Sequence, residues 1–288
     1  MNFQGILAAD AAAVQARLTA VLSDKADEPV IHAMRYALIG GKGLRGFLVL
    51  EGARLHGLGD RALSAAAAIE ALHAYSLIHD DLPCMDDDDL RRGQPTVHKK
   101  WDEAVAVLAG DALQTLAFEL LYDPALGSAE VRMALVLGLA KASGAEGMVL
   151  GQALDMAAEV AETPLTLDQI TQLQAGKTGA LIRFAARAGA IIAGADPKPL
   201  DAYAQALGLA FQIADDILDV KGDPAKAGKR LGKDAAAGKA TFVSLLGLQG
   251  AEARAAELVA EAEASLVPYG DKAAGLVAAA RFVISRES

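Results

Sequence analysis

Two groups of carboxylates, far apart in the chain, are the residues best placed to do chemistry. The first begins at Asp80 and Asp81 and holds six aspartates within ten residues, and Arg91 and Arg92 follow it. The second reads DDILD at positions 215–219 within an otherwise apolar run. Clustered like charges resist burial unless a cation joins them. Carboxylate oxygens without a Cys or His cluster suit hard divalent ions, above all Mg²⁺.

Helical spacing would gather these carboxylates into lines. Asp215 and Asp219 are four residues apart, which places them one turn apart on one face of a helix. His73, Ser76 and Asp80 stand at i, i+3 and i+7 and also share a face. If two such helices faced each other, they would hold several divalent cations between them. The alternative is that the first group is a solvated acidic turn.

A second set of residues could bind anions directly. The segment GGKGLRG at 40–46 places two cations at the expected start of a helix, where exposed amides and the helix dipole favour an anion. A flexible turn with solvated cations is the alternative. The candidate cations are Lys42, Arg45, Arg91, Arg92, Lys177, Lys229 and Lys239.

Both kinds of site together indicate a diphosphate substrate, and the apolar remainder of the chain would supply a pocket for a hydrocarbon tail. Mg²⁺ acting as a Lewis acid would make the diphosphate a good leaving group and leave a cationic carbon behind.

The composition restricts the class of protein. The 288 residues carry a net charge of −10, which argues against a general nucleic-acid surface. Cys84 is the only cysteine, so no intrachain disulfide can form and a reducing compartment is expected. The N-terminus has no signal-peptide pattern, and no uninterrupted apolar run reaches the roughly 18 residues of a membrane span. We therefore expect a cytoplasmic protein without a membrane span.

The hydrophobic pattern predicts an all-α protein, because nearly every segment follows the helical period. No linker divides the chain, so residues 1–288 are expected to form a single domain. Pro83 should bend the helix near 61–81, and this bend could bring Asp86 back toward Asp80. Glycines at 176 and 179 interrupt the long helix expected near 166–192. Because glycine destabilises a helix interior, this interruption predicts a kink with a functional role. The other helices are expected near 6–22, 29–39, 44–56, 101–121, 129–143, 148–158, 197–219, 241–248, 251–265 and 270–284.

These motifs also carry a resemblance to a known family. The patterns DDxxxxD at 80–86, RRG at 91–93 and DDxxD at 215–219 resemble the two aspartate-rich regions of trans-polyprenyl diphosphate synthases. The stretch EALHAYSLIH at 70–79 is especially similar to bacterial farnesyl diphosphate synthases. The match runs in order from about Gly40 to Thr241, and FVISR at 282–286 resembles the family's tail.

The resemblance implies an isoprenoid synthase fold around a central cavity, commonly a homodimer. It also implies condensation of isopentenyl diphosphate with dimethylallyl and geranyl diphosphate to give farnesyl diphosphate. Three Mg²⁺ ions, which Mn²⁺ could replace, would be held by Asp80, Asp81, Asp86, Asp215, Asp216 and Asp219. The allylic diphosphate would meet Arg91, Lys177, Lys229 and Lys239. Isopentenyl diphosphate would meet Lys42, Arg45, His73 and Arg92. Thr178 and Gln212 would place oxygens near the developing allylic cation.

The helix that ends near Asp80 also carries a candidate for the residue that limits product length, called the ruler below. Tyr75 and Ser76 lie five and four residues before Asp80, about one turn back. If metal fixes the diphosphate at Asp80, the growing tail should run toward them, and Tyr75 would stop growth near fifteen carbons. The alternative is that Tyr75 only packs against a neighbouring helix.

One departure from the family pattern affects an expected binding site. Gly43 and Gly46 stand where the family usually has Arg and Pro, so the turn should be looser and affinity for isopentenyl diphosphate weaker.

Alternative functions remain within the same family, namely those of a geranylgeranyl or a geranyl diphosphate synthase. From other classes, a class I terpene cyclase is disfavoured by the aromatic content of only 5%. A non-catalytic regulatory subunit would be expected to lose one Asp group, and this chain keeps both.

Overall fold

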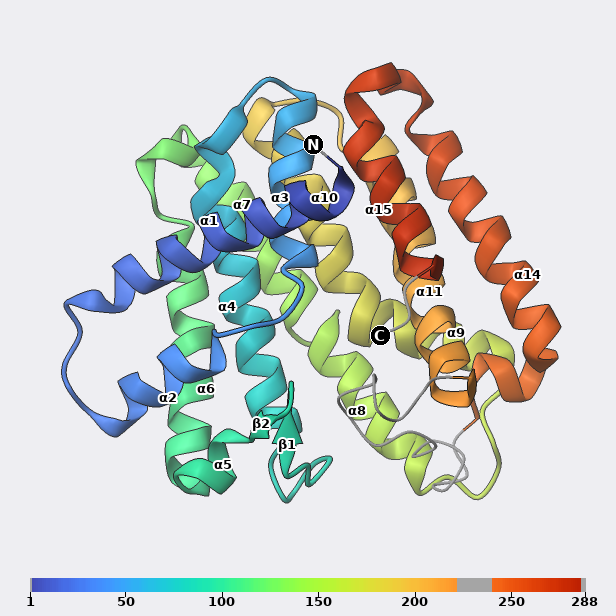
Figure 1. Cartoon of the computed structure of the whole chain (residues 1–288), viewed down its shortest axis with the longest axis horizontal. Coiled ribbons are helices and arrows are strands. Elements are labelled where there is room, and N and C mark those ends of the chain that lie inside the picture. Colours follow the sequence, from blue (N-terminus) through green and yellow to red (C-terminus); the bar gives the residue numbers. More distant parts are fainter. Residues whose placement is uncertain (1, 222–239, 286–288) are drawn as a thin grey trace.

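The computed structural model describes residues 2–221 and 240–285, and in these ranges it confirms the all-α class (Figure 1). The α-helices are α1 (Phe3–Ser23), α2 (Pro29–Ala37), α3 (Leu44–Leu55), α4 (Leu63–Asp80), α5 (Val97–Lys100), α6 (Glu103–Leu120), α7 (Ala129–Ser143), α8 (Met148–Glu159), α9 (Leu167–Gln174), α10 (Ala180–Ala193), α11 (Lys198–Lys221), α14 (Phe242–Ser265) and α15 (Ala274–Ser285). Short 3-10 turns are η1 (Gly59–Ala62), η2 (Pro124–Leu126) and η4 (Val267–Ala273), and η3 (Ala175–Gly179) is a π-helix.

Local capping chemistry explains where several helices begin. The side chains of Asn2, Asp102 and Ser128 accept hydrogen bonds from the first-turn amides of α1, α6 and α7. Thr166 and Gln169 have the sequence spacing of a capping box, and they form one at the start of α9. These caps place the observed helix starts within a few residues of the predicted ones.

A small hairpin follows the first acidic group, where period-2 alternation is too short to be detected. Strands β1 (Leu90–Arg91) and β2 (Gln94–Pro95) are antiparallel, with Leu90 opposite Pro95. Arg92 and Gly93 make the turn with φ values of 54° and 72°. Positive φ at both central residues is the geometry of a tight hairpin turn.

Helix α4 lies among α1, α3 and α6 and is buried along most of its length (Figure 1). Its first half is rich in alanine, and small side chains let neighbouring backbones approach closely. The same principle operates where α3 crosses α10. A Cβ on Gly189 would lie 2.2 Å from the backbone nitrogen of Ala53, and one on Gly52 would lie 2.9 Å from the carbonyl oxygen of Ala186. This crossing therefore requires glycine.

Two helical segments, Phe3–Ser23 and Ala129–Glu159, are long and apolar enough to cross a membrane by length and composition alone. Core helices of soluble proteins pass the same test. In this structure α1 packs on α3 and α4, and α7 packs on α10. The second segment contains α7, a turn at Gly144–Gly147 and α8, so it is not one continuous helix.

We expect Gly189→Ala to destabilise the protein by about 3 kcal/mol or more, because the added methyl group would enter the backbone of α3. Urea unfolding followed by circular dichroism measures this change in the free energy of unfolding.

Gly138→Ala in α7 is the matched control. Its Cβ would make an ordinary contact, 3.5 Å from the ring of Phe184. Because alanine favours a helix interior by about 1 kcal/mol over glycine, this variant should be neutral or more stable. Equal destabilisation by the two substitutions would contradict the close crossing of α3 and α10.

Candidate active site

The first acidic group begins at the C-terminal end of α4 and continues into the turn before the hairpin. Asp80 is the last residue of the helix, and the backbone N–H of Asp86 donates to the carbonyl oxygen of Asp80 over 2.8 Å. The bend after the helix therefore returns the chain to Asp80, as the sequence suggested.

Asp80 lies in an environment that opposes its negative charge. Burial raises the pKa of Asp80 to about 6, and the charges of Asp86 and Asp81 act in the same direction. Lys177 and Arg91 oppose this rise through their positive charges. Since α4 and the π-helix η3 are far apart in sequence, the effect of Lys177 shows that the fold brings these two predicted site residues near each other.

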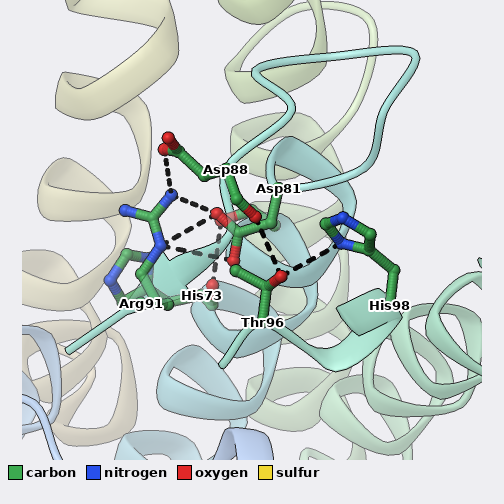
Figure 2. A network of polar contacts seen from close by, with 7 residues as sticks. His73, Asp81, Asp88, Arg91, Thr96 and His98 are labelled. Carbon is green, nitrogen blue, oxygen red and sulfur yellow. Dashed lines mark hydrogen bonds and ion pairs between the residues drawn. The ribbon is translucent and has the colours of Figure 1, made fainter. Parts of the chain in front are cut away.

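Asp81 is held by Arg91 rather than exposed to a ligand. Its side chain is only 4% exposed and accepts a hydrogen bond from Arg91 Nε over 2.9 Å, with a second contact from Nη2. Figure 2 shows the guanidinium of Arg91 between the carboxylates of Asp81 and Asp88, the latter 3.6 Å away. This arrangement fixes the first strand of the hairpin against the end of α4.

Thr96 fixes the second side of the hairpin. Its hydroxyl donates to the carbonyl oxygen of Asp88 over 2.8 Å and lies 3.2 Å from Nδ1 of His98 (Figure 2). The backbone N–H of Thr96 also donates to the carbonyl oxygen of Asp89. The polar network of Figure 2 thus holds the hairpin in place.

In the second acidic group, Asp216 has a structural position. It is buried and accepts hydrogen bonds from Gln212 Nε2 over 3.2 Å and from the backbone N–H of Phe242 over 2.8 Å. Phe242 is the first residue of α14, so Asp216 joins α11 to the start of that helix. Asp215 lies on a less buried face, and its charge acts on Arg45 of α3.

The predicted kink at 176–179 is a π-helical turn, a feature found often at functional sites. It carries Lys177 and Thr178. Thr178 Oγ1 lies 3.3 Å from Oε1 of Gln212, so the two residues predicted to act near the allylic cation are in contact. Helix α8 packs directly on this turn, because a Cβ on Gly151 would lie 2.0 Å from the backbone nitrogen of Lys177.

Asp155 of α8 contacts this turn, although no motif in the sequence indicated a role for it. Its Oδ2 accepts a hydrogen bond from Lys177 Nζ over 2.6 Å, and both side chains are largely shielded from solvent. The available signal was a carboxylate three residues after Gln152 within an apolar helix. Spacing alone could not show which element lies opposite it.

The predicted isopentenyl diphosphate residues surround the start of α3. Arg92 Nη1 donates to the carbonyl oxygens of Ile39 and Gly40 over 3.0 and 2.8 Å, which ties the hairpin to the glycine-rich segment. Burial, together with the charges of Arg45, Arg92 and Arg91, holds the pKa of His73 well below its usual range. The imidazole is therefore neutral and can accept or donate a hydrogen bond.

The other predicted residues have different surroundings. Lys42 is exposed, with its Nζ 5.9 Å from the centre of the Phe282 ring. Tyr75 is 9% exposed and stacks edge-on against His79, with ring centres 4.9 Å apart. Ser76 donates to the carbonyl oxygen of His73 over 2.9 Å. Lys229 and Lys239 lie outside the described residues.

The carboxylates fit a hard divalent cation by donor chemistry. Among the residues that the structure describes, no three His, Cys, Asp or Glu side chains already form a metal cluster. Asp80 is nevertheless a half-buried carboxylate whose charge is opposed by those of Asp86 and Asp81, a state that a divalent cation would relieve. Asp81 and Asp216 contact Arg91 and the start of α14, and Asp80, Asp86, Asp215 and Asp219 complete the predicted set of metal ligands.

Comparison with known proteins identifies the family of the chain. The polyprenyl synthetase family matches residues 27–266. The chain is 50% identical to a farnesyl diphosphate synthase of Escherichia coli, over 90% of this chain and 89% of that protein. It is 46% identical to the Haemophilus influenzae farnesyl diphosphate synthase, over 90% of each.

A solved structure extends the similarity to the whole fold. The apo structure of an FPP/GFPP synthase from Zymomonas mobilis is 46% identical, with a TM-score of 0.90 over 98% of this chain and 99% of that one. Sequence motifs, fold and relatives agree, and the chain belongs to the polyprenyl synthetase family.

Proposed function

We propose that this protein is a Mg²⁺-dependent farnesyl diphosphate synthase that condenses isopentenyl diphosphate with dimethylallyl and then geranyl diphosphate. The observation that supports this best is the π-helical turn, which sets Lys177 near Asp80 and places Thr178 against Gln212. This arrangement provides a cation for a diphosphate and two oxygens beside it. The names of the similar proteins support the same activity.

In this proposal the carboxylates of Asp80, Asp81, Asp86, Asp215, Asp216 and Asp219, near the ends of α4 and α11, would hold the metal ions. Bound Mg²⁺ would neutralise charge on the allylic diphosphate and make it a better leaving group. Lys177, with Arg91, Lys229 and Lys239, would hold that diphosphate directly. Asp155 would orient Lys177 through their 2.6 Å contact.

The protein's own residues then control bond formation. When the allylic C–O bond breaks, the oxygens of Thr178 and Gln212 would stabilise positive charge on the allyl group. The double bond of isopentenyl diphosphate, held by Lys42, Arg45, His73 and Arg92, attacks the allylic carbon and forms the new C–C bond. Loss of one proton from the isopentenyl unit, to the departed diphosphate, completes the reaction.

The direct test is incubation of the protein with labelled isopentenyl diphosphate, dimethylallyl diphosphate and Mg²⁺, followed by sizing of the products. A fifteen-carbon diphosphate is expected, and its formation should stop in excess chelator. Asp80→Ala and Asp215→Ala should lower kcat by about three orders of magnitude or more while leaving the melting temperature nearly unchanged. Full activity in chelator would contradict the metal's role.

Asp216→Ala provides a contrast. Because Asp216 accepts the N–H of Phe242 in a buried position, its loss should also reduce stability by about 2 kcal/mol. Unchanged stability of this variant would contradict the anchoring role given to Asp216.

Product length tests the predicted ruler. Tyr75→Ala should open space beside α4 and shift the products toward twenty carbons or more, because each added CH₂ that is buried gains about 0.8 kcal/mol. Chromatography of the dephosphorylated products measures this shift.

Tyr75→Phe is its matched control, since it keeps the ring that stacks on His79 and removes only the hydroxyl. This variant should still make the fifteen-carbon product. If the active Tyr75→Ala enzyme also stops at fifteen carbons, Tyr75 is a packing residue and not the ruler.

We also propose that residues 1–288 form one domain that acts as a cytoplasmic homodimer. Large apolar side chains are exposed on α6 and α7, including Leu108 at 56% and Met133 at 67%. Sedimentation should give twice the 29.6 kDa chain mass, and Leu108→Glu should shift it toward the monomer. Val267→Glu, at an exposed position on η4, is the control, and it should leave the sedimentation mass unchanged. A monomer in the unsubstituted protein would contradict the proposal.

A further inference from the structure

Glu70 of α4 has a position that neither the motifs nor the proposed chemistry accounts for. It lies one helical turn before His73, and its Oε1 accepts a hydrogen bond from the backbone N–H of Gly46 over 2.8 Å. Gly46 is the third residue of α3, within the first turn, where backbone N–H groups have no partner inside the helix. The residue before the helix, Gly43, provides no side-chain cap. The carboxylate of Glu70 therefore caps α3 from a neighbouring helix.

Glu70 is also the main counter-charge for two predicted binding residues. Burial lowers the pKa of Arg45, and among the surrounding charges Glu70 opposes this most strongly. Burial likewise lowers the pKa of Arg92, and Glu70 is again the charge that opposes this lowering most strongly. Arg45 and Arg92 also repel each other, because the charge of Arg92 lowers the pKa of Arg45. A shielded pair of guanidiniums needs such an anion nearby.

The space around Glu70 is small. Glu70 and Arg92 line a cavity of about 30 Å³ together with Gly40, Gly41 and Gly43. That volume suits a water molecule and is too small for another anionic side chain. A Cβ on Gly46 would lie 3.2 Å from Val14 Cγ2 and 3.3 Å from Glu70 Cγ, so Gly46 and Glu70 are closely packed. The carboxylate is therefore held in one place by packing and by the Gly46 amide.

We propose that Glu70 is a positioning residue for the isopentenyl diphosphate site. Its carboxylate fixes the first turn of α3 and the guanidiniums of Arg45 and Arg92 in the arrangement that receives the diphosphate. Gly46 contributes the N–H that anchors it, which proline at this position could not donate. The N–H of Gly46 thus anchors the turn to Glu70, whereas the sequence alone predicted a looser turn. This inference rests on the proposed function.

Glu70→Gln tests the charge, because glutamine keeps an oxygen that can accept the N–H of Gly46. We expect the KM for isopentenyl diphosphate to rise about tenfold, while the KM for dimethylallyl diphosphate stays within about twofold and the melting temperature is nearly unchanged. If Glu70 only repels the incoming diphosphate, the KM for isopentenyl diphosphate would fall instead. A fall, no change, or an equal rise for both substrates would overturn the proposal.

Gly46→Pro tests the anchor, and Gly46→Ala is its matched control because alanine keeps the N–H. Proline is tolerated in the first turn of a helix. Gly46→Pro should raise the KM for isopentenyl diphosphate severalfold more than Gly46→Ala does, and equal effects would contradict the role of the amide.

Calorimetric binding of isopentenyl diphosphate alone separates this inference from the proposed function. Weaker binding to Glu70→Gln than to the unsubstituted protein supports the positioning role even if no condensation is observed. Equal or tighter binding overturns that role even if the unsubstituted enzyme makes farnesyl diphosphate.

Discussion

The partial burial of charged groups at the ends of α4 and α11 and on η3 is the constraint on which the rest of the site depends. An ionised group removed from water is stable only with a partner of opposite charge or with several hydrogen bonds. Protein groups supply such partners: Arg91 for Asp81, Asp155 for Lys177, and the amide of Phe242 for Asp216. These contacts stabilise the charges of Asp81, Lys177 and Asp216, whereas the surroundings of Asp80 oppose its negative charge.

Close approach of the helix backbones makes these contacts possible. Gly151 allows α8 to touch the π-helical turn that carries Lys177, and Gly110 allows α6 to receive His79, whose Nε2 would lie 2.1 Å from a Cβ there. His79 then lies 3.0 Å from the carbonyl oxygen of Val107 and packs against Tyr75. The glycines near the site thus fix distances between helices that carry the reactive groups.

Much of the fold, and the residues of the candidate site, could be proposed from the sequence, because helical periodicity, capping residues and aspartate spacing are local signals. The capping box at Thr166 and the irregular turn around Lys177 are examples. The Asp155–Lys177 and Glu70–Gly46 contacts could not be predicted this way. They join different helices, and only the packing of those helices decides which residues meet.

Helix geometry also explains why the two aspartates of each pair differ. Neighbouring residues on a helix point about 100° apart, so the side chains of two adjacent aspartates enter different surroundings. In the first pair Asp81 turns to Arg91, and in the second Asp216 turns to the start of α14. Asp80 and Asp215 are left on the less buried face, where Asp80 meets the charge of Lys177 and Asp215 that of Arg45. Each pair therefore combines one buried carboxylate that joins two parts of the fold with one carboxylate on a less buried face.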